Sequence, residues 1–228
     1  MTKRLVWDLP LRLFHWLFVL SICGSYTTAK AGVDWMQYHF YFGYFMIGLL
    51  IFRIVWGFIG PQHARFSSFL AGPSKVITYA RGLFGPAVHV SVGHNPLGGL
   101  MVILMIVLVA VQASTGLFTT DTIIWNGPYY PAVSGQTSSL LSTVHSVNFN
   151  IILGAVGLHL AAIVYYHWVK KQNLVSAMFT GYKPAASVPE HLAIASSQLL
   201  KALVVCAAAA GIVYWILAKA PPPADSSF

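Results

Sequence analysis

The sequence has very few charged side chains. Of its 228 residues, 13 are Lys or Arg and five are Asp or Glu, so that 8% are charged, whereas an average soluble domain carries about 25%. Hydrophobic residues make up 57% of the chain. So few charges cannot cover the surface of a water-soluble protein of this size, and the composition also excludes a disordered chain. The sequence therefore predicts an integral membrane protein that folds as an all-α helical bundle.

Cysteine is scarce as well. The two cysteines, Cys23 and Cys206, lie in separate apolar runs and form no Cys-x-x-Cys motif. This excludes a disulfide scaffold, a cysteine zinc site and a thiol redox pair. We expect each cysteine to be a small buried hydrophobic residue.

Acidic residues are absent from every long apolar stretch. A proton pump or a cation-coupled transporter usually needs a carboxylate inside the membrane. The sequence therefore disfavours that class of protein. The five acidic residues, all outside these stretches, are Asp8, Asp34, Asp121, Glu190 and Asp225.

Five apolar stretches approach the roughly 20 residues that a helix needs to cross a bilayer. The third has no charge, and Arg53 is the one charge in the second. We expect transmembrane helices over residues 12–29, 39–60, 97–118, 145–168 and 199–218. Residues 119–144 are then an outer loop without Lys or Arg, which either docks a partner or is a passive connector.

Lys and Arg are distributed unevenly between the ends of these stretches. If the N-terminus is cytoplasmic, eleven lie on the inner side and two, Lys30 and Lys219, on the outer side. This excess predicts a cytoplasmic N-terminus and a C-terminus on the outer side. The net charge of +8 lies at the ends of apolar runs, so we expect contact with membrane lipid and none with nucleic acid. The inner set is Lys3, Arg4, Arg12, Arg53, Arg65, Lys75, Arg81, Lys170, Lys171, Lys183 and Lys201.

Four of the nine histidines lie in the predicted spans at matching depths. His15 is near the inner face, whereas His39 and His145 open their spans near the outer face. His159 follows His145 by fourteen residues, which places it about 21 Å deeper on nearly the same helix face. The pattern pairs His39 with His145 on the outer side and His15 with His159 on the inner side.

Two facing imidazoles can hold a haem through both axial positions of its iron. Such ligation leaves no open site for oxygen chemistry and favours electron transfer, and two haems at different depths would carry electrons across the bilayer. Two alternatives are histidines that hydrogen-bond between helices and a histidine-lined metal transporter.

Neighbouring residues agree with this interpretation. Arg12 and Arg53 lie on the inner side and are candidates for binding a haem propionate, although both could instead be snorkelling anchors. Gly43, Gly154 and Gly157 lie near the histidines and either leave room for a planar group or allow close helix packing.

Several motifs resemble the bacterial cytochrome b561 / nickel–iron hydrogenase b-type cytochrome family. They are VWDLPLRLFHW at residues 6–16, His39-x-x-x-Gly43, RIVWGFIG at 53–60, and GHNPLGG at 93–99. The two histidines of the fourth span are also similar to the gamma subunit of membrane formate dehydrogenases.

The resemblance implies a dihaem b-type cytochrome of the bacterial inner membrane, with two haem b held by His15, His39, His145 and His159. Such an electron-transfer subunit links a periplasmic partner, a c-type cytochrome or a nickel–iron hydrogenase, to the quinone pool. The formate dehydrogenase likeness implies a quinone site near the inner haem, where His94, Asn95 and Arg53 are candidates by location.

The C-terminal part departs from the family pattern. The hydrogenase cytochromes usually stop after four spans, so we expect a dihaem four-helix domain over residues 1–185 and an additional helix with a short tail over residues 186–228. The wider b561 group also suggests a superoxide:quinone oxidoreductase. That activity needs a cationic outer funnel, and this outer side has only Lys30 and Lys219.

Overall fold

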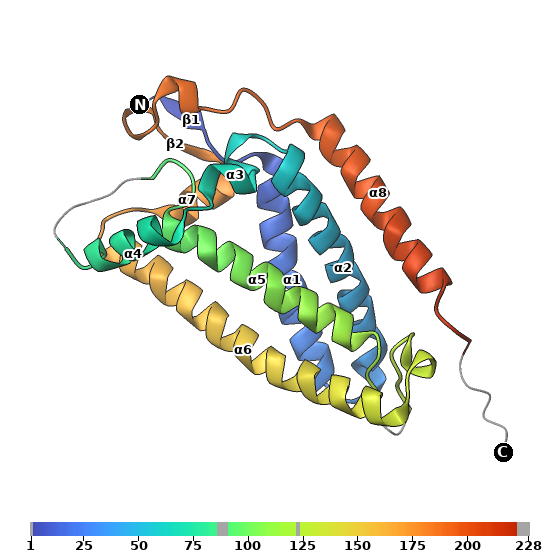
Figure 1. Cartoon of the computed structure of the whole chain (residues 1–228). Coiled ribbons are helices and arrows are strands. Elements are labelled where there is room, and N and C mark those ends of the chain that lie inside the picture. The colour runs from blue at the N-terminus through green and yellow to red at the C-terminus, as the bar shows by residue number, and fades with distance from the viewer. Residues whose placement is uncertain (1, 86–90, 122–123, 223–228) are drawn as a thin grey trace, which may run out of the picture. The chain divides into compact units, whose positions relative to one another are not determined.

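The computed structural model describes residues 2–85, 91–121 and 124–222. These residues form eight α-helices and one two-stranded sheet (Figure 1). Five helices are long and apolar enough to cross a membrane, which confirms the predicted all-α membrane fold. They are α1 (Leu9–Lys30), α2 (Met36–Ile59), α5 (Pro96–Gly116), α6 (Gly135–Trp168) and α8 (Leu199–Ala218).

The long helices expose most of their apolar surface. In α5, whose mean hydropathy reaches 2.4, only 11% of the membrane-spanning window is buried inside the protein. Side chains as large as Leu20, Phe58 and Leu158 are exposed. A helix that is apolar all round is stable when its outward face meets lipid rather than water. The chain is therefore a multi-pass membrane protein.

Local sequence signals begin two of these helices. The Asp8 carboxylate accepts a hydrogen bond from Leu11 N at 2.9 Å, directly before α1. The Asn95 side chain accepts one from Gly98 N at 2.7 Å, and Pro96 opens α5. Both arrangements satisfy main-chain N–H groups that have no partner within the first turn of a helix.

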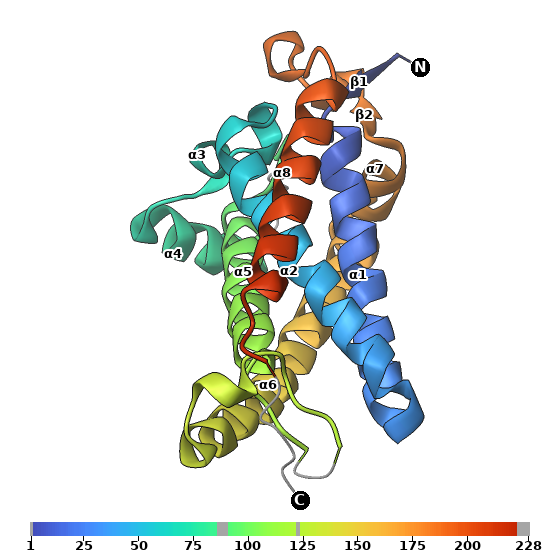
Figure 2. The ribbon, with the colours of Figure 1, turned by 90° about the vertical axis from the view of Figure 1, so that its right-hand side faces the viewer.

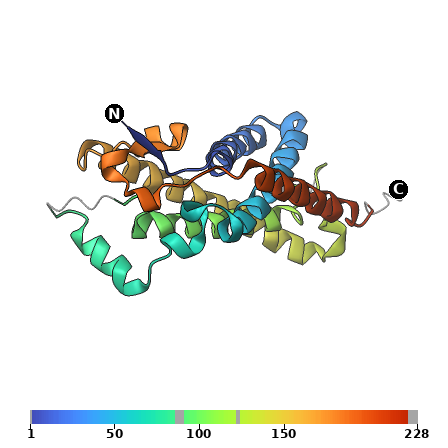
Figure 3. The same ribbon diagram turned by 90° about the horizontal axis from the view of Figure 1, so that it is seen from above.

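Three short helices and the sheet complete the regular structure. The helices α3 and α4 follow the end of α2 (Figure 3). The strands β1 and β2 pair antiparallel with Arg4 opposite Lys183, and α7 leads into β2 (Figure 1). The bounds are α3 (Phe66–Phe69), α4 (Pro73–Gly82), α7 (Leu174–Thr180), β1 (Lys3–Leu5) and β2 (Tyr182–Pro184). Single 3₁₀ turns occur at Val33–Trp35, Gln62–Ala64, Tyr130–Ala132, Ala185–Ser187 and Glu190–Leu192.

The segment of residues 182–198, here called the strap, ties the N-terminus to the start of α8 (Figure 2). Arg4 donates hydrogen bonds to the carbonyl groups of Ala185 and Val188. Ahead of the strap, Gly181 ends α7 with φ of +87°. A Cβ there would lie 2.7 Å from Trp7 O, so both the backbone conformation and the close approach require glycine.

The chain divides into two compact units, each of which contains parts of the long helices. The first unit comprises residues 1–15, 53–105 and 155–205, and the second comprises residues 16–52, 106–154 and 206–228. The first unit contains all eleven Lys and Arg residues that the sequence assigns to the inner side. The second contains the remaining two, Lys30 and Lys219.

Two sequence-based expectations are wrong. The fourth membrane helix begins at Gly135 rather than at residue 145, so ten residues of the predicted outer loop are helical. Ser134 accepts a hydrogen bond from Thr137 N and starts this polar first turn, which hydropathy does not detect. The second error concerns Cys23 and Cys206, which are exposed rather than buried, since these helices have few neighbours to cover their outward faces.

Candidate functional site: two histidine pairs and a buried polar cluster

The first histidine pair lies in the second unit. His39 of α2 faces His145 of α6, with 6.2 Å between the ring centroids and 74° between the ring planes. Nδ1 of His39 lies 2.8 Å from Ser25 O, and Nδ1 of His145 lies 2.9 Å from Gln112 O. Because a carbonyl oxygen only accepts hydrogen bonds, each Nδ1 carries the hydrogen. Nε2 of both rings therefore keeps the lone pair that binds a metal.

The second histidine pair lies in the first unit. His15 of α1 and His159 of α6 have ring centroids 6.5 Å apart and ring planes inclined by 52°. The structure thus brings together the same two pairs that residue depth predicts from the sequence.

The spacing within both pairs suits two imidazoles bound to opposite faces of one iron. An imidazole nitrogen lies about 2 Å from a metal ion, and the ring centre lies about 1 Å further away, so two such rings have centres about 6 Å apart. All four histidines are half-buried. Part of each ring is therefore not covered by other side chains.

The nearby glycines border open space. A Cβ at Gly43, Gly154 or Gly157 would meet no atom within 4 Å. Close helix packing therefore does not explain these three glycines. The space beside them is compatible with a bulky planar group.

The number of ligands at each pair favours haem over a bare metal ion. Among the described residues, no group of three or more His, Cys, Asp or Glu side chains is placed to hold a metal. A protein zinc site normally uses three or four side chains. A haem iron needs only two, since the porphyrin supplies the other four nitrogens.

Arg12 and Arg53 both lie in the first unit, where His15 and His159 face each other. Arg53 is 2% exposed; it donates to Ala64 O at 3.2 Å and lies over the ring of Phe66. Its burial excludes the alternative that Arg53 is a snorkelling anchor at the membrane surface. Arg12 donates to Phe179 O. Within the part of the chain that the structure describes, Nε of Arg12 and Nη2 of Arg53 are buried without a hydrogen-bond acceptor.

The comparison with known families agrees with this geometry. A model of prokaryotic cytochrome b561 matches residues 6–181. The chain belongs to the prokaryotic cytochrome b561 family. Membership confirms the resemblance seen in the sequence motifs and implies haem b as a cofactor. The helix α8 lies beyond the matched region.

Curated relatives of this cytochrome b561 family member carry one title, "Probable Ni/Fe-hydrogenase B-type cytochrome subunit". The protein from Rhizobium leguminosarum bv. viciae is 24% identical over 209 residues, which cover 77% of this chain and 87% of that protein. The protein from Azotobacter chroococcum mcd 1 is 26% identical over 214 residues, covering 80% and 89%. No solved structure matches the chain significantly.

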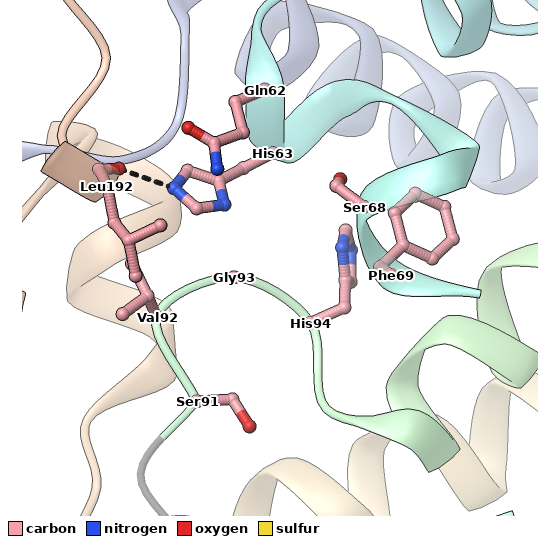
Figure 4. A pocket seen from close by; sticks show the side chains of 9 residues that line it. All are labelled: Gln62, His63, Ser68, Phe69, Ser91, Val92, Gly93, His94 and Leu192. Atoms are coloured by element: carbon pink, nitrogen blue, oxygen red, sulfur yellow. Dashed lines mark hydrogen bonds between the residues drawn. The ribbon is translucent and has the colours of Figure 1, made fainter. Parts of the chain in front are cut away.

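The first unit of this cytochrome also contains a small pocket of about 230 Å³ (Figure 4). Its lining includes His63, Ser68 and His94. The His94 ring lies between Trp7 and Phe69, with 4.7 Å from its centroid to each of theirs. Nδ1 of His94 is buried and has no hydrogen-bond partner among the described residues.

Burial lowers the pKa of both pocket histidines. Burial, followed by the positive charge of Arg53, lowers the pKa of His94 to about 3. Burial also lowers the pKa of His63, whose Nε2 lies 2.8 Å from Leu192 O in the strap and donates to it (Figure 4). Both imidazoles are therefore neutral near pH 7.

Asn95, the other candidate from the same motif, is fully engaged with protein groups. Its amide donates to the Tyr166 hydroxyl at 2.9 Å, and its oxygen caps α5. The Tyr166 hydroxyl is also 2.7 Å from that of Tyr79. Asn95 thus positions a chain of two tyrosine hydroxyls.

Three polar residues of the first unit, Asp8, His63 and Lys183, were not predicted as candidates from the sequence. Asp8 is 1% exposed, His63 is buried, and Lys183 of the strap donates to the carbonyl groups of Ser91 and Val92. Burial lowers the pKa of Lys183. All three lie outside the apolar stretches. The one sequence feature that could have pointed to them is the position of Asp8 inside the VWDLPLRLFHW motif.

Proposed function

We propose that this cytochrome carries two haem b groups and transfers electrons across the bacterial inner membrane. His39 and His145 would hold the outer haem, and His15 and His159 the inner haem. The observation that carries this proposal is the presence of two facing imidazole pairs, at 6.2 and 6.5 Å. Each bound haem would supply one-electron redox chemistry without an open coordination position.

The protein groups around each pair would orient the ligands and neutralise charge. The carbonyl groups of Ser25 and Gln112 fix the ring orientation of His39 and His145, and such outer partners also make a ligating nitrogen more basic. On the inner side, the buried donors of Arg12 and Arg53 are suited to carboxylates, because a guanidinium binds a carboxylate through charge-assisted hydrogen bonds. The propionates of the inner haem are their proposed partners.

The charge distribution supports an orientation in the membrane. The first unit contains eleven of the 13 Lys and Arg residues, and cytoplasmic regions carry the excess of positive charge. The proposal therefore places the inner pair and the N-terminus on the cytoplasmic side, and the outer pair and the C-terminus on the periplasmic side.

The relatives are named as hydrogenase subunits, so a nickel–iron hydrogenase is the first candidate partner. We propose that this partner donates electrons on the periplasmic side, and a c-type cytochrome is the second candidate. The haems that His39 with His145 and His15 with His159 would hold would supply the one-electron chemistry between this donor and the quinone pool. His94 is the proposed quinone contact near the inner haem, since its neutral ring has a buried nitrogen without a protein partner. Asn95 and Arg53 would support that site.

The first experiment is the haem content of the purified protein with a dithionite-reduced minus oxidised spectrum. The proposal predicts two b-type haems per chain with low-spin bands. A colourless, folded protein from haem-replete cells would contradict it.

The partner is tested separately in membrane vesicles. Reduction of the haems by hydrogen gas, only when the hydrogenase is present, would support the hydrogenase as donor. Reduction by a reduced c-type cytochrome instead would support the second candidate. In either case, added quinone should reoxidise the haems, and a His94→Gln variant should slow this step.

A further inference from the structure

Asp8 is a buried carboxyl group whose two oxygens have different surroundings. Oδ1 accepts hydrogen bonds from Leu11 N at 2.9 Å and from Trp56 Nε1 at 3.0 Å. Oδ2 is buried and has no hydrogen-bond donor among the described residues. The residue is 1% exposed. A carboxylate in this state is costly unless it is paired or protonated.

Arg53 is the charged residue that acts electrostatically on Asp8. The two side chains do not form an ion pair. Among the described residues, one salt bridge within 4.0 Å occurs, and it joins Arg4 to Glu190. Nη2 of Arg53 also lacks an acceptor. Burial raises the pKa of Asp8, whereas the hydrogen bonds and the charge of Arg53 oppose this rise. The buried carboxyl group is therefore easier to protonate than an exposed aspartate.

Asp8 directly precedes the helix α1, which carries the proposed inner haem ligand His15. Arg12 and His15 follow it by four and seven residues, and Arg12 N donates to the carbonyl oxygen of Asp8 at 3.2 Å in the first turn of α1. Seven residues correspond to about 10 Å along the helix axis. At an effective dielectric constant of about 20, one unit charge at about 10 Å changes proton affinity about tenfold.

We propose that Asp8 is the redox-linked proton site of the inner haem. When one electron reaches the inner site, the Asp8 carboxylate takes up one proton from the cytoplasmic side and becomes a neutral carboxyl group. When the electron leaves, the proton is released. The proposal rests on the proposed function, because it needs a haem between His15 and His159.

The other titratable and charged groups around Asp8 do not replace it in this role. Arg53 and Arg12 carry guanidinium groups and no carboxyl group. His63 and His94 are held neutral by burial, and Lys183 is committed to two carbonyl groups. Among these groups Asp8 is the one acid.

The test is a spectroelectrochemical titration of both haems across the pH range in which the protein is folded. In the wild type, the midpoint potential of the inner haem should fall by about 60 mV in total as pH rises. This is the potential change that corresponds to a tenfold change in proton affinity for a one-electron couple. The inner haem is identified as the haem that a His145→Ala variant retains. In Asp8→Asn, which keeps the hydrogen-bond acceptor for Leu11 and Trp56, this dependence should disappear.

Two further measurements separate a proton site from a structural role. The reduced-minus-oxidised infrared spectrum of the wild type should contain the carbonyl band of a protonated carboxyl group, and Asp8→Asn should lack it. In Trp56→Phe the carboxylate loses a donor, so its proton affinity should rise about tenfold and the pH-dependent range should move upward. Glu190→Gln removes an exposed carboxylate of the same unit and should change neither result.

A wild-type pH dependence that persists in Asp8→Asn would overturn this inference, as would an inner haem whose midpoint does not vary with pH. Both results leave the two haems in place and the proposed function intact. Loss of the proposed function is distinguishable, because it would appear as a wild-type protein without two haems.

Discussion

His94 illustrates how a single side chain in a loop acquires its properties from the folded structure. Its ring lies between Trp7 and Phe69, and Arg53 and Lys183 act on it electrostatically. The sequence places His94 beside a membrane helix but cannot show this enclosure. Its role as a quinone contact remains a proposal.

The depressed pKa of His94 predicts acid sensitivity. The unfolded chain protonates His94 near its ordinary pKa of 6.5, whereas the folded chain does so only near 3. Neutral His94 therefore contributes fully to the free energy of unfolding above pH 6.5. This contribution is lost as pH falls, by at most about 1.4 kcal/mol for each pH unit. We expect the thermal unfolding temperature in detergent to fall less between pH 7 and pH 5 in His94→Gln than in the wild type. Equal falls would contradict this, and the exposed His191→Gln serves as control.

Arg53 gives a second prediction at the scale of one residue. Its buried positive charge should stabilise the reduced state of the inner haem, because reduction removes one positive charge from the iron. We expect Arg53→Gln to lower the midpoint potential of the inner haem by tens of millivolts and to leave the outer haem unchanged. Arg65→Gln, on an exposed residue of the same unit, is the matched control. Equal shifts of both haems would refute a local role.

At the scale of elements, hydropathy predicts the membrane helices well and the polar segments poorly. Four predicted spans, the first, second, third and fifth, agree with α1, α2, α5 and α8 within about three residues at each end. The first ten residues of α6 were missed because they are polar and give no apolar run. The pairing of β1 with β2 could not be predicted either, since it joins three-residue strands about 180 residues apart in the chain.

The start of α6 can be tested through its cap. Ser134 Oγ accepts the hydrogen bond from Thr137 N at 3.2 Å. Replacing such a cap by alanine costs about 1 kcal/mol, so Ser134→Ala should speed hydrogen exchange of the first-turn amides about fivefold. Ser139→Ala, on an exposed serine in the same helix, should not. If both variants exchange at the wild-type rate, the polar turn does not depend on this cap.

At the scale of the whole molecule, one helix supplies a histidine to each of the two units. His145 lies in the second unit and His159 in the first, fourteen residues apart on α6. The partners come from different helices, His39 from α2 and His15 from α1. The sequence predicted these pairs because fourteen residues correspond to nearly four whole helical turns. It could not predict the burial of Asp8, since that depends on contacts between residues far apart in the chain, such as the hydrogen bond from Trp56 to Asp8.

The most direct test of the account is the haem content of the four single variants His15→Ala, His39→Ala, His145→Ala and His159→Ala. Each should retain one haem. His39→Ala and His145→Ala should both keep the inner haem, with the same potential and spectrum. His15→Ala and His159→Ala should both keep the outer haem. His167→Ala, on α6 outside both pairs, should keep two haems. If the variants group differently, or if all four keep both haems, the proposed pairing is wrong.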